Sequence, residues 1–346
     1  MVQHKLNVGL IGFGHAGKYL HMPFLLAAGF EIVMVATSRG SEVRESLPHA
    51  EVVSDMADII NRDDIDLAVL ATPTQYHLEH ALAAIVARKP VVIEKPFGVD
   101  LLEALKVSTA ARQAGVDIFC YHNRGWDSDY LLTKKVIMAG GLGLIHAYTA
   151  RWDRYRPIVR SRWREDGRPG SGVLLDLGPH LIDQSLQLFG KPSWVQADLL
   201  YERIGAVSDD GFTIRMGGNN LPRITLEASS LSLTSPYRYA VEGKYGGFIK
   251  KGLDVQEKQI RAGISPLSRQ FGKEPKEFWG TLILPDGNSM RLRPPPGQWI
   301  TFYKNVAACL KKTSSPAVTI DQAVFTMRIL EAVRLSALNH ARISLP

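Results

Sequence analysis

Three side chains of this chain could move a proton to or from a substrate. Lys95 carries an ammonium group and follows a short apolar run, within the sequence Glu94-Lys95-Pro96. Asp176 and His180 are four residues apart in a segment with helical periodicity, so we expect them to share one helix face. A carboxylate beside an imidazole fixes the tautomer of the ring and raises its basicity, as a general base requires. Both patterns also occur in purely structural roles, so neither one alone decides the function.

A glycine-rich pattern near the N-terminus points to a second kind of chemistry. Gly12, Gly14 and Gly17 form G-x-G-x-x-G directly after the apolar run 6–11. In a strand-to-helix turn, these glycines permit the tight turn, the approach of a pyrophosphate and close packing of the helix on the strand. The start of the helix then faces the anion. The pattern predicts a dinucleotide site whose candidate contacts are Gly12, Phe13, Gly14, His15, Ala16 and Gly17.

The residues after the second predicted strand indicate which dinucleotide would bind. In NAD sites an acidic residue about 20 positions further on accepts the ribose 2′-hydroxyl. Here the strand 31–36 is followed by Thr37, Ser38 and Arg39, which offer two hydroxyls and a guanidinium. Donors in place of an acceptor suit a 2′-phosphate, so we expect NADP in preference to NAD. Such a tripeptide also occurs in ordinary solvated loops.

A parallel sheet would position these residues. In the first third of the chain, short apolar runs alternate with helical patterns, which is typical of parallel strands joined by crossover helices. We predict strands at 7–11, 31–36, 66–71, 91–93 and 116–120, and helices at 15–27, 56–61, 77–87 and 101–114. Ligands of such sheets bind beyond the carboxyl ends of the strands. The further candidate cofactor contacts near these ends are Thr72, Pro73, His77, Glu94, Lys95 and Asn123.

The pattern changes after residue 123. Strand-like runs occur at 144–152, 194–201, 212–216, 223–233, 239–242 and 280–284, between helical patterns at 126–139 and 319–339. We expect an α/β protein with a Rossmann doubly wound parallel sheet over residues 1–123. A second domain of α+β type over 124–346 would hold a large, mostly antiparallel or mixed sheet. The length of 346 residues agrees with two domains of about 150 residues each.

Composition excludes several other classes of protein. Hydrophobic residues make up 45% and charged residues 22%, as in ordinary globular proteins, and the net charge of +7 is modest for this length. Cys120 and Cys309 form neither a disulfide framework nor a C-x-x-C pair, which is typical of the cytoplasm. No apolar run approaches the roughly 18 residues of a membrane span, so no membrane partner is expected. His77 and His80 lack further ligands nearby, so no metal is expected.

An arginine-rich segment at 151–164 interleaves six arginines with aromatic residues. Basic and aromatic residues mixed in this way can indicate nucleic-acid binding. The segment leads directly into the motif that contains Asp176, so we interpret it instead as a loop bordering a substrate cleft. There Tyr155 and Trp163 could stack on a sugar ring, and no nucleic-acid partner is expected.

Taken together, the chain resembles the glucose-fructose oxidoreductase and inositol 2-dehydrogenase family, Gfo/Idh/MocA, over nearly its whole length. The motifs that carry the resemblance are the glycine turn, Glu94-Lys95-Pro96, Asn123-Arg124, and the Gly-Ser-Gly segment leading to Asp176 and His180. Ser171 stands where the family often has glycine, a change that should leave the backbone turn intact. Residues 124–129 and the arginine-rich stretch look similar to the subgroup of NADP-dependent scyllo-inositol dehydrogenases.

The resemblance implies an activity and an assembly. It implies NADP(H)-dependent hydride transfer between nicotinamide and a secondary alcohol or carbonyl of a polyol, inositol or sugar. Lys95 and His180 would lie at the reacting hydroxyl, with Asp176 supporting them. The substrate domain would also form a homodimer or homotetramer through its open sheet. The substrate contacts expected on this basis are Lys95, Arg124, Tyr155, Trp163, Asp176 and His180.

Two questions stay open at this point. An imidazole with an ordinary pKa of about 6.5 is mostly neutral at pH 7 whereas a lysine near about 10.4 is not, so we favour His180 as the base. Lys95 would then stabilise the alkoxide, and the roles exchange if burial lowers the pKa of the lysine. An NADP-dependent reductase of another carbonyl or an imine would use the same residues. A non-catalytic NADP-binding sensor could share the fold, although the presence of both Lys95 and His180 argues against it.

Overall fold

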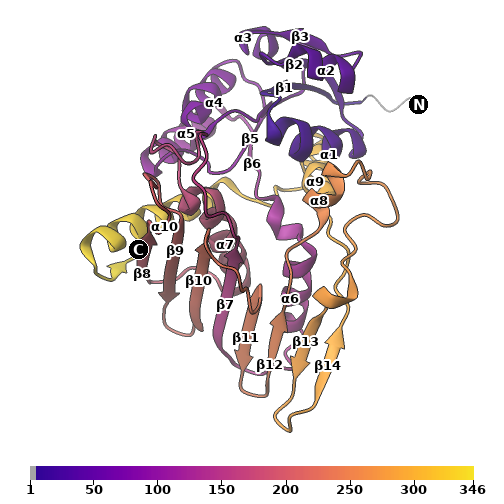
Figure 1. Cartoon of the computed structure of the whole chain (residues 1–346). Coiled ribbons are helices and arrows are strands. Elements are labelled where there is room, and N and C mark those ends of the chain that lie inside the picture. Colours follow the sequence, from indigo (N-terminus) through magenta and orange to yellow (C-terminus); the bar gives the residue numbers. More distant parts are fainter. Residues whose placement is uncertain (1–4) are drawn as a thin grey trace. The chain divides into compact units, whose positions relative to one another are not determined.

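The computed structural model describes residues 5–346, which form two compact units (Figure 1). The first unit comprises residues 5–123, Gln256–Phe271 and Trp299–Val324. The second unit comprises Arg124–Val255, Gly272–Gln298 and Phe325–Pro346. The chain therefore enters the second unit after Asn123 and returns twice to the first unit.

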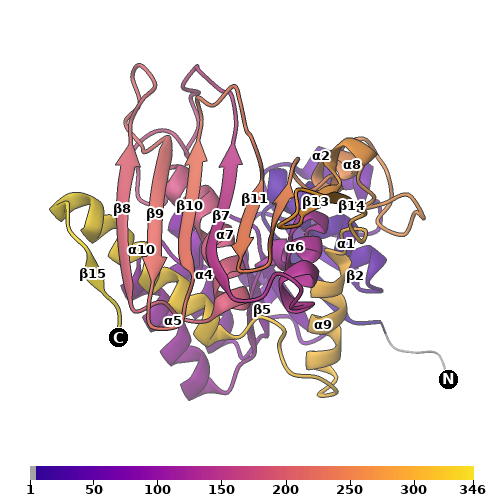
Figure 2. The same ribbon diagram turned by 90° about the horizontal axis from the view of Figure 1, so that it is seen from below.

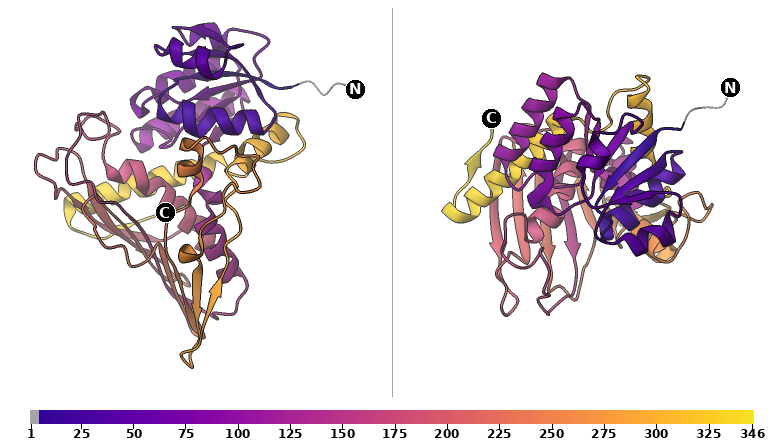
Figure 3. Two further views of the ribbon diagram at one scale, coloured as in Figure 1. Left: turned by 45° about the vertical axis from the view of Figure 1, so that its right-hand side comes forward. Right: turned by 90° about the horizontal axis from the view of Figure 1, so that it is seen from above.

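Six parallel strands form the sheet of the first unit, in the order β3-β2-β1-β4-β5-β6. The strands are β1 (Asn7–Ile11), β2 (Glu31–Ala36), β3 (Glu51–Val53), β4 (Leu67–Leu70), β5 (Val91–Ile93) and β6 (Ile118–Cys120). This is the strand order of the Rossmann fold and confirms the predicted parallel sheet. Leu10 and Val69 in the central strands are fully buried because helices cover both faces of the sheet (Figures 1 and 3).

Helices connect these strands and complete the first unit. They are α2 (Gly40–Ser46), α3 (Ala57–Ile60), η2 (Thr74–Tyr76), α4 (His77–Val86), α5 (Leu101–Ala114), α8 (Gln256–Arg261) and α9 (Ile300–Leu310). The predicted helix 15–27 is divided into a π-helix, η1 (Ala16–His21), and α1 (Met22–Ala27). Pro23 explains the division, because it has no N–H to donate to the preceding turn, and a widened turn lies directly before it.

The second unit contains a mixed sheet in the order β14-β13-β12-β11-β7-β10-β9-β8-β15. Its strands are β7 (Ile145–Asp153), β8 (Trp194–Leu200), β9 (Gly211–Gly217), β10 (Arg223–Ser229), β11 (Tyr239–Gly243), β12 (Gly246–Lys250), β13 (Gly280–Ile283), β14 (Ser289–Leu292) and β15 (Ile343–Ser344). Only β7 and β10 pair in parallel, and the other pairs are antiparallel. The predicted mixed, mostly antiparallel sheet is thus confirmed.

Helices of the second unit lie against one face of this sheet (Figure 2). They include α6 (Ser128–Met138), α7 (Val173–Phe189) and most of α10 (Ile320–Asn339), with the short helices η3 (Asn123–Trp126) and η4 (Lys276–Phe278) at element boundaries. Along β10, Ile224 and Leu226 are buried against this helical layer, whereas Thr225 and Glu227 on the other face are half-buried. Within residues 5–346, no helix combines the length and the apolar character needed to cross a membrane.

Candidate active site

The glycine turn after β1 is closed on its inner side and open on its outer side. Gly12 has a φ of 98°, and a Cβ placed there would lie 2.7 Å from the carbonyl oxygen of Ala71. A Cβ on Gly17 would lie 2.2 Å from the carbonyl oxygen of Gly12, so neither position accepts a side chain. Nothing lies within 4 Å of a Cβ built on Gly14. The turn therefore leaves space beside the backbone where a diphosphate could approach.

Two cations lie at the end of β2. The Arg39 guanidinium contacts one oxygen of Glu42 (Nη1 to Oε1, 3.3 Å), and the ammonium of Lys18 contacts the other (Nζ to Oε2, 3.0 Å). The Arg39 amide donates to the Thr37 hydroxyl (3.1 Å), which shapes the turn that holds Ser38. The Lys18 hydrogen bond is the main reason that the pKa of Glu42 is lowered. Sequence reasoning missed Lys18, although its position one helical turn after Gly14 is a usable signal.

His77, a predicted cofactor contact, is buried between two backbone segments. Its Nδ1 faces the carbonyl oxygen of Pro96 at 2.9 Å, and its Nε2 faces that of Thr72 at 3.0 Å. A neutral imidazole donates through only one nitrogen, so one of these contacts lacks a proton unless the ring is charged. Burial lowers the pKa of His77 and opposes that charge. The ring thus connects the segment after β4, which also contains Pro73, with the segment after β5.

The backbone beside Lys95 is fixed by a buried chain of polar side chains. The Glu94 carboxylate accepts a hydrogen bond from the Lys95 amide (2.8 Å) and lies 3.2 Å from Nε2 of His21. The other ring nitrogen of His21 lies 2.5 Å from the Tyr303 hydroxyl in α9. Burial alone would raise the pKa of Glu94, but the contact with His21 and nearby positive charge outweigh it, and the pKa is lowered. The peptide bond from Lys95 to Pro96 is cis.

Asn123 ends the first unit and is almost fully buried. Its side-chain nitrogen Nδ2 has no hydrogen-bond partner within residues 5–346. A buried amide donor without an acceptor is uncommon in folded proteins. The Asn123 side chain could therefore donate a hydrogen bond to a bound molecule.

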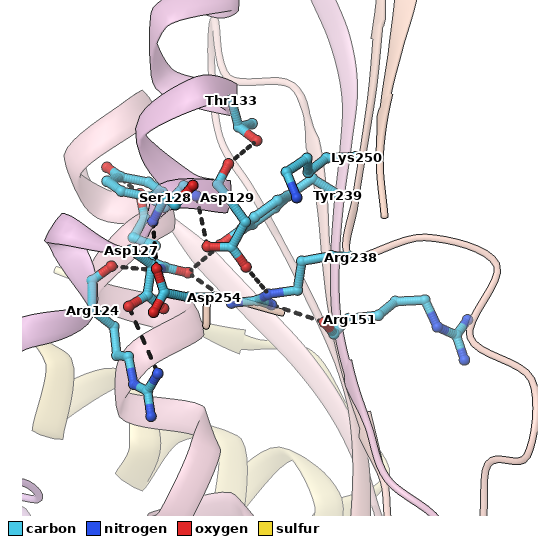
Figure 4. Close-up of polar contacts among 12 residues, drawn as sticks. Arg124, Asp127, Ser128, Asp129, Thr133, Arg151, Arg238, Tyr239, Lys250 and Asp254 are labelled. Carbon is cyan, nitrogen blue, oxygen red and sulfur yellow. Dashed lines mark hydrogen bonds and ion pairs between the residues drawn. The ribbon is translucent and has the colours of Figure 1, made fainter. Parts of the chain in front are cut away.

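In the second unit, Arg124 belongs to a buried polar network (Figure 4). Its guanidinium lies 3.7 Å from the Asp127 carboxylate and 4.9 Å from the centre of the Trp152 ring. Arg238 contacts the same ring at 4.7 Å and pairs with the buried Asp129 at 3.1 Å. Trp152 was not a predicted site residue. In β7 it is one of the buried side chains that alternate with half-buried ones. Arg124 therefore lies between the Asp127 carboxylate and the Trp152 ring.

The structure places Asp176 and His180 in the same helix, α7, one turn apart. The segment before α7 can adopt its path only with glycine at 172, where φ is 100° and a Cβ would lie 2.0 Å from Oδ1 of Asp209. The other oxygen of Asp209 accepts from the Leu174 amide at 2.5 Å and so holds the start of the helix. Burial raises the pKa of Asp209 to about 6.

Asp176 and His180 occupy different surroundings. The Asp176 carboxylate lies between two guanidiniums, 3.4 Å from Nη1 of Arg154 and 3.5 Å from Nε of Arg164. The His180 ring is buried and faces the Trp152 ring, with centroids 5.8 Å apart. Because Trp152 also contacts Arg124, the structure brings two of the predicted substrate residues to one aromatic ring.

The remaining predicted substrate residues lie on the arginine-rich segment. Tyr155 is 53% exposed and pairs with Leu231 in an isolated bridge. Trp163 is half-buried, and the Arg164 guanidinium lies 4.3 Å from the centre of its ring. In the described part of the chain, no group of three or more His, Cys, Asp or Glu side chains could hold a metal ion.

Comparison with known proteins identifies the family. Residues 6–122 match the NAD-binding Rossmann fold of the Gfo/Idh/MocA oxidoreductases, and residues 134–345 match their C-terminal alpha/beta domain. The chain belongs to this family. It is therefore an oxidoreductase with a nicotinamide dinucleotide-binding domain, as the resemblance implied.

Several relatives are similar to the chain over nearly its full length. The scyllo-inositol 2-dehydrogenase (NADP(+)) IolW of Bacillus subtilis is 37% identical, over 96% of this chain and 94% of its own length. The uncharacterized oxidoreductase YdgJ of Escherichia coli is 35% identical, over 99% of both chains. Among solved structures, the Bacillus subtilis protein yvaA gives a TM-score of 0.96 at 36% identity, with 99% of both chains covered.

Proposed function

We propose that this protein is an NADP(H)-dependent dehydrogenase that transfers hydride between nicotinamide and a secondary alcohol or carbonyl of a polyol, inositol or sugar. The observation that carries the proposal is the placement of Asp176 and His180 one helical turn apart, in a chain that also has an open glycine turn. The similarity to an NADP-dependent inositol dehydrogenase supports the same class of substrate.

The cofactor would bind along the carboxyl ends of the strands in the first unit. Gly12, Gly14 and Gly17 would accommodate the diphosphate, and the open space at Gly14 fits such a group. When bound, the nicotinamide supplies the acceptor or donor of the hydride. The 2′-phosphate would lie against Thr37, Ser38, Arg39 and, in addition to the sequence prediction, Lys18. The other proposed contacts are Phe13, His15, Ala16, Thr72, Pro73, His77, Glu94, Lys95 and Asn123.

The proposed proton transfer uses Lys95 and His180. In the oxidative direction His180 accepts the hydroxyl proton of the substrate, and the Lys95 ammonium stabilises the alkoxide. Asp176 would support the reacting group while Arg154 and Arg164 fix its carboxylate. In the reductive direction the same groups donate the proton. The other proposed substrate contacts, besides Lys95, Asp176 and His180, are Arg124, Tyr155 and Trp163.

We also propose that the uncovered face of the nine-stranded sheet joins copies of the chain into a dimer or tetramer. On this face Thr225 of β10 lies beside Thr149 of β7 and Arg215 of β9, and Arg151 of β7 pairs with Glu227 of β10. In a two-fold dimer the same surface patch of both copies meets. Sedimentation velocity tests this, since Thr225→Arg should convert the assembly to smaller species, whereas a monomeric wild type contradicts it.

A substrate screen tests the activity. Polyols, inositols and sugars are incubated with NADP⁺ and with NAD⁺, and the absorbance of reduced nicotinamide is followed; ketones, aldehydes and imines are tested with NADPH. We expect oxidation of a polyol, inositol or sugar, faster with NADP⁺ than with NAD⁺. Activity confined to another carbonyl or an imine would favour the alternative reductase. Binding of NADPH without turnover of any compound would favour a sensor.

A further inference from the structure

The second unit contains a cavity whose wall includes Asp176 and carries more positive than negative side chains. The cationic side chains in its wall are Arg154, Arg156, Arg162, Arg164 and Arg203. The acidic side chains in its wall are Glu165, Asp176 and Asp209.

Each of two acids in the wall is shared by two arginines. Glu165 lies between Arg162 and Arg203, 2.9 Å from the second of these. The Asp176 carboxylate is divided in the same way between two further guanidiniums of the wall. Because each carboxylate already contacts two cations, neither provides a separate partner for the fifth arginine, Arg156.

Arg156 is the cation whose charge is left without a partner. Its guanidinium makes no ion pair and no side-chain hydrogen bond within residues 5–346, yet the side chain is half-buried. Burial and the neighbouring charges of Arg154, Arg162 and Arg160 lower the pKa of Arg156. An arginine stays charged at neutral pH even so, and a charge in this position gains strongly from an anion.

The backbone of Arg156 is held in place before any ligand binds. Its amide donates to the carbonyl oxygen of Ser230 at 2.7 Å, and its carbonyl accepts from the Arg203 guanidinium at 3.3 Å. Arg203 is in turn buried and paired with Asp210 at 3.2 Å. A cation on a fixed backbone loses less freedom on binding than one on a mobile loop.

We propose that this cavity binds an oxyanion group, a carboxylate or a phosphate, carried by the substrate, with the Arg156 guanidinium as its main partner. Because Asp176 lies in the same wall, this inference rests on the proposed function and narrows it. The substrate class would be sugar or polyol acids or phosphates rather than neutral inositols. A planar guanidinium can bind either a carboxylate or a phosphate through two parallel hydrogen bonds, so Arg156 suits both groups.

Binding is tested first without turnover, so that the result does not depend on catalysis. Isothermal titration calorimetry measures the affinity of the full chain for glucuronate and for inorganic phosphate, with saturating NADP⁺ present to occupy the cofactor site. Arg156→Gln is compared with Arg168→Gln, a matched control that removes the same charge from an exposed arginine outside the cavity wall. We expect Arg156→Gln to raise the Kd for at least one probe about tenfold or more, and Arg168→Gln to change it less than about twofold. Absence of binding to wild type, or equal losses in both variants, would overturn the proposal.

Turnover measurements then show whether a carboxylate or a phosphate is preferred. They also test this inference separately from the proposed function. Glucose, glucuronate and glucose 6-phosphate form one matched set, and myo-inositol with its monophosphate forms another. We expect kcat/KM for an anionic member to exceed that of its neutral partner about tenfold at low salt, and this preference to fall with added salt and in Arg156→Gln. Turnover of neutral compounds without any anionic preference would refute this inference and leave the proposed function intact. Arg156-dependent binding with no turnover of any compound would refute the proposed function and leave an anion site.

Discussion

Glu42 is shared by two cations, Arg39 from the loop after β2 and Lys18 from η1. A 2′-phosphate bound there would compete with Glu42 for both. Arg39→Ala should therefore raise the KM for NADP⁺ about tenfold, because charge-assisted hydrogen bonds to the phosphate are lost. The KM for NAD⁺ should change less than about twofold. Initial rates measured with each cofactor check this.

The control for this experiment is Lys106→Ala. Lys106 is exposed on α5 and carries the same charge, so its removal should leave both Michaelis constants unchanged. Equal increases for NADP⁺ and NAD⁺ in Arg39→Ala would contradict the proposed phosphate contact and would make Thr37-Ser38-Arg39 an ordinary loop.

The catalytic roles proposed for Lys95 and His180 can be tested separately from cofactor binding. Lys95→Met and His180→Ala should each lower kcat by about 10²–10⁴, the usual contribution of an acid or base group. Both variants should still bind NADPH, as followed by its fluorescence. Lys106→Met serves as the control for loss of a lysine. Wild-type activity in both variants would rule out the proposed roles.

At the scale of an element, the turn from β1 to η1 makes a sharper test than any single side chain. Gly14→Ala should leave the melting temperature of the free protein unchanged, because a Cβ there meets nothing within 4 Å, but should weaken NADP binding at least about tenfold. Gly12→Ala should lower the melting temperature, because its φ of 98° and the Ala71 carbonyl both oppose a side chain. Thermal unfolding with and without NADP⁺ distinguishes the two. Equal loss of stability in both variants would be incompatible with an open turn at Gly14.

Apolar, buried elements were predictable from the sequence, and polar or partly exposed ones were not. The predicted strands 7–11, 31–36 and 91–93 agree with β1, β2 and β5 at both ends. In contrast, β3 begins with the exposed Glu51 and β14 is exposed along most of its length, so neither shows the apolar run that marks a strand. Two adjacent glycines at the start of β12 concealed that strand in the same way.

The motifs of the candidate site were visible in the sequence, but the residues that hold them were not. The path from Lys95 through Glu94 to His21 ends at Tyr303, which is 282 positions from His21 in the chain. No periodicity connects residues so far apart. Arg156 was one of six similar arginines in the sequence, and only the pairing of its neighbours singles it out.

At the scale of the whole molecule, pH should act on stability through a buried carboxyl. The pKa of Asp209 is raised by burial from 3.8 to about 6, so the folded chain binds this proton more tightly than the unfolded chain. The resulting stabilisation is complete below about pH 4 and is lost as the pH rises through about 6.

Asp209→Asn tests this dependence, since asparagine can still accept from the Leu174 amide but cannot ionise. We expect the melting temperature of the variant, relative to wild type, to increase between about pH 4 and pH 7. Differential scanning calorimetry at several pH values measures this difference. A difference that is constant with pH would show that Asp209 titrates normally.

Because the chain returns twice to the first unit, this unit cannot be completed until late in synthesis. Trp299 packs on Phe24 with ring centres 5.6 Å apart, and Phe302 packs on Tyr121 at 4.9 Å. The six strands of the parallel sheet leave the ribosome long before these partners, by about 10–40 s at ordinary rates of translation. During that interval Phe24 and Tyr121 lack their covering aromatics. A nascent chain stopped before residue 299 would therefore expose aromatic side chains. Chaperones and proteases could recognise incomplete protein by this exposed apolar surface.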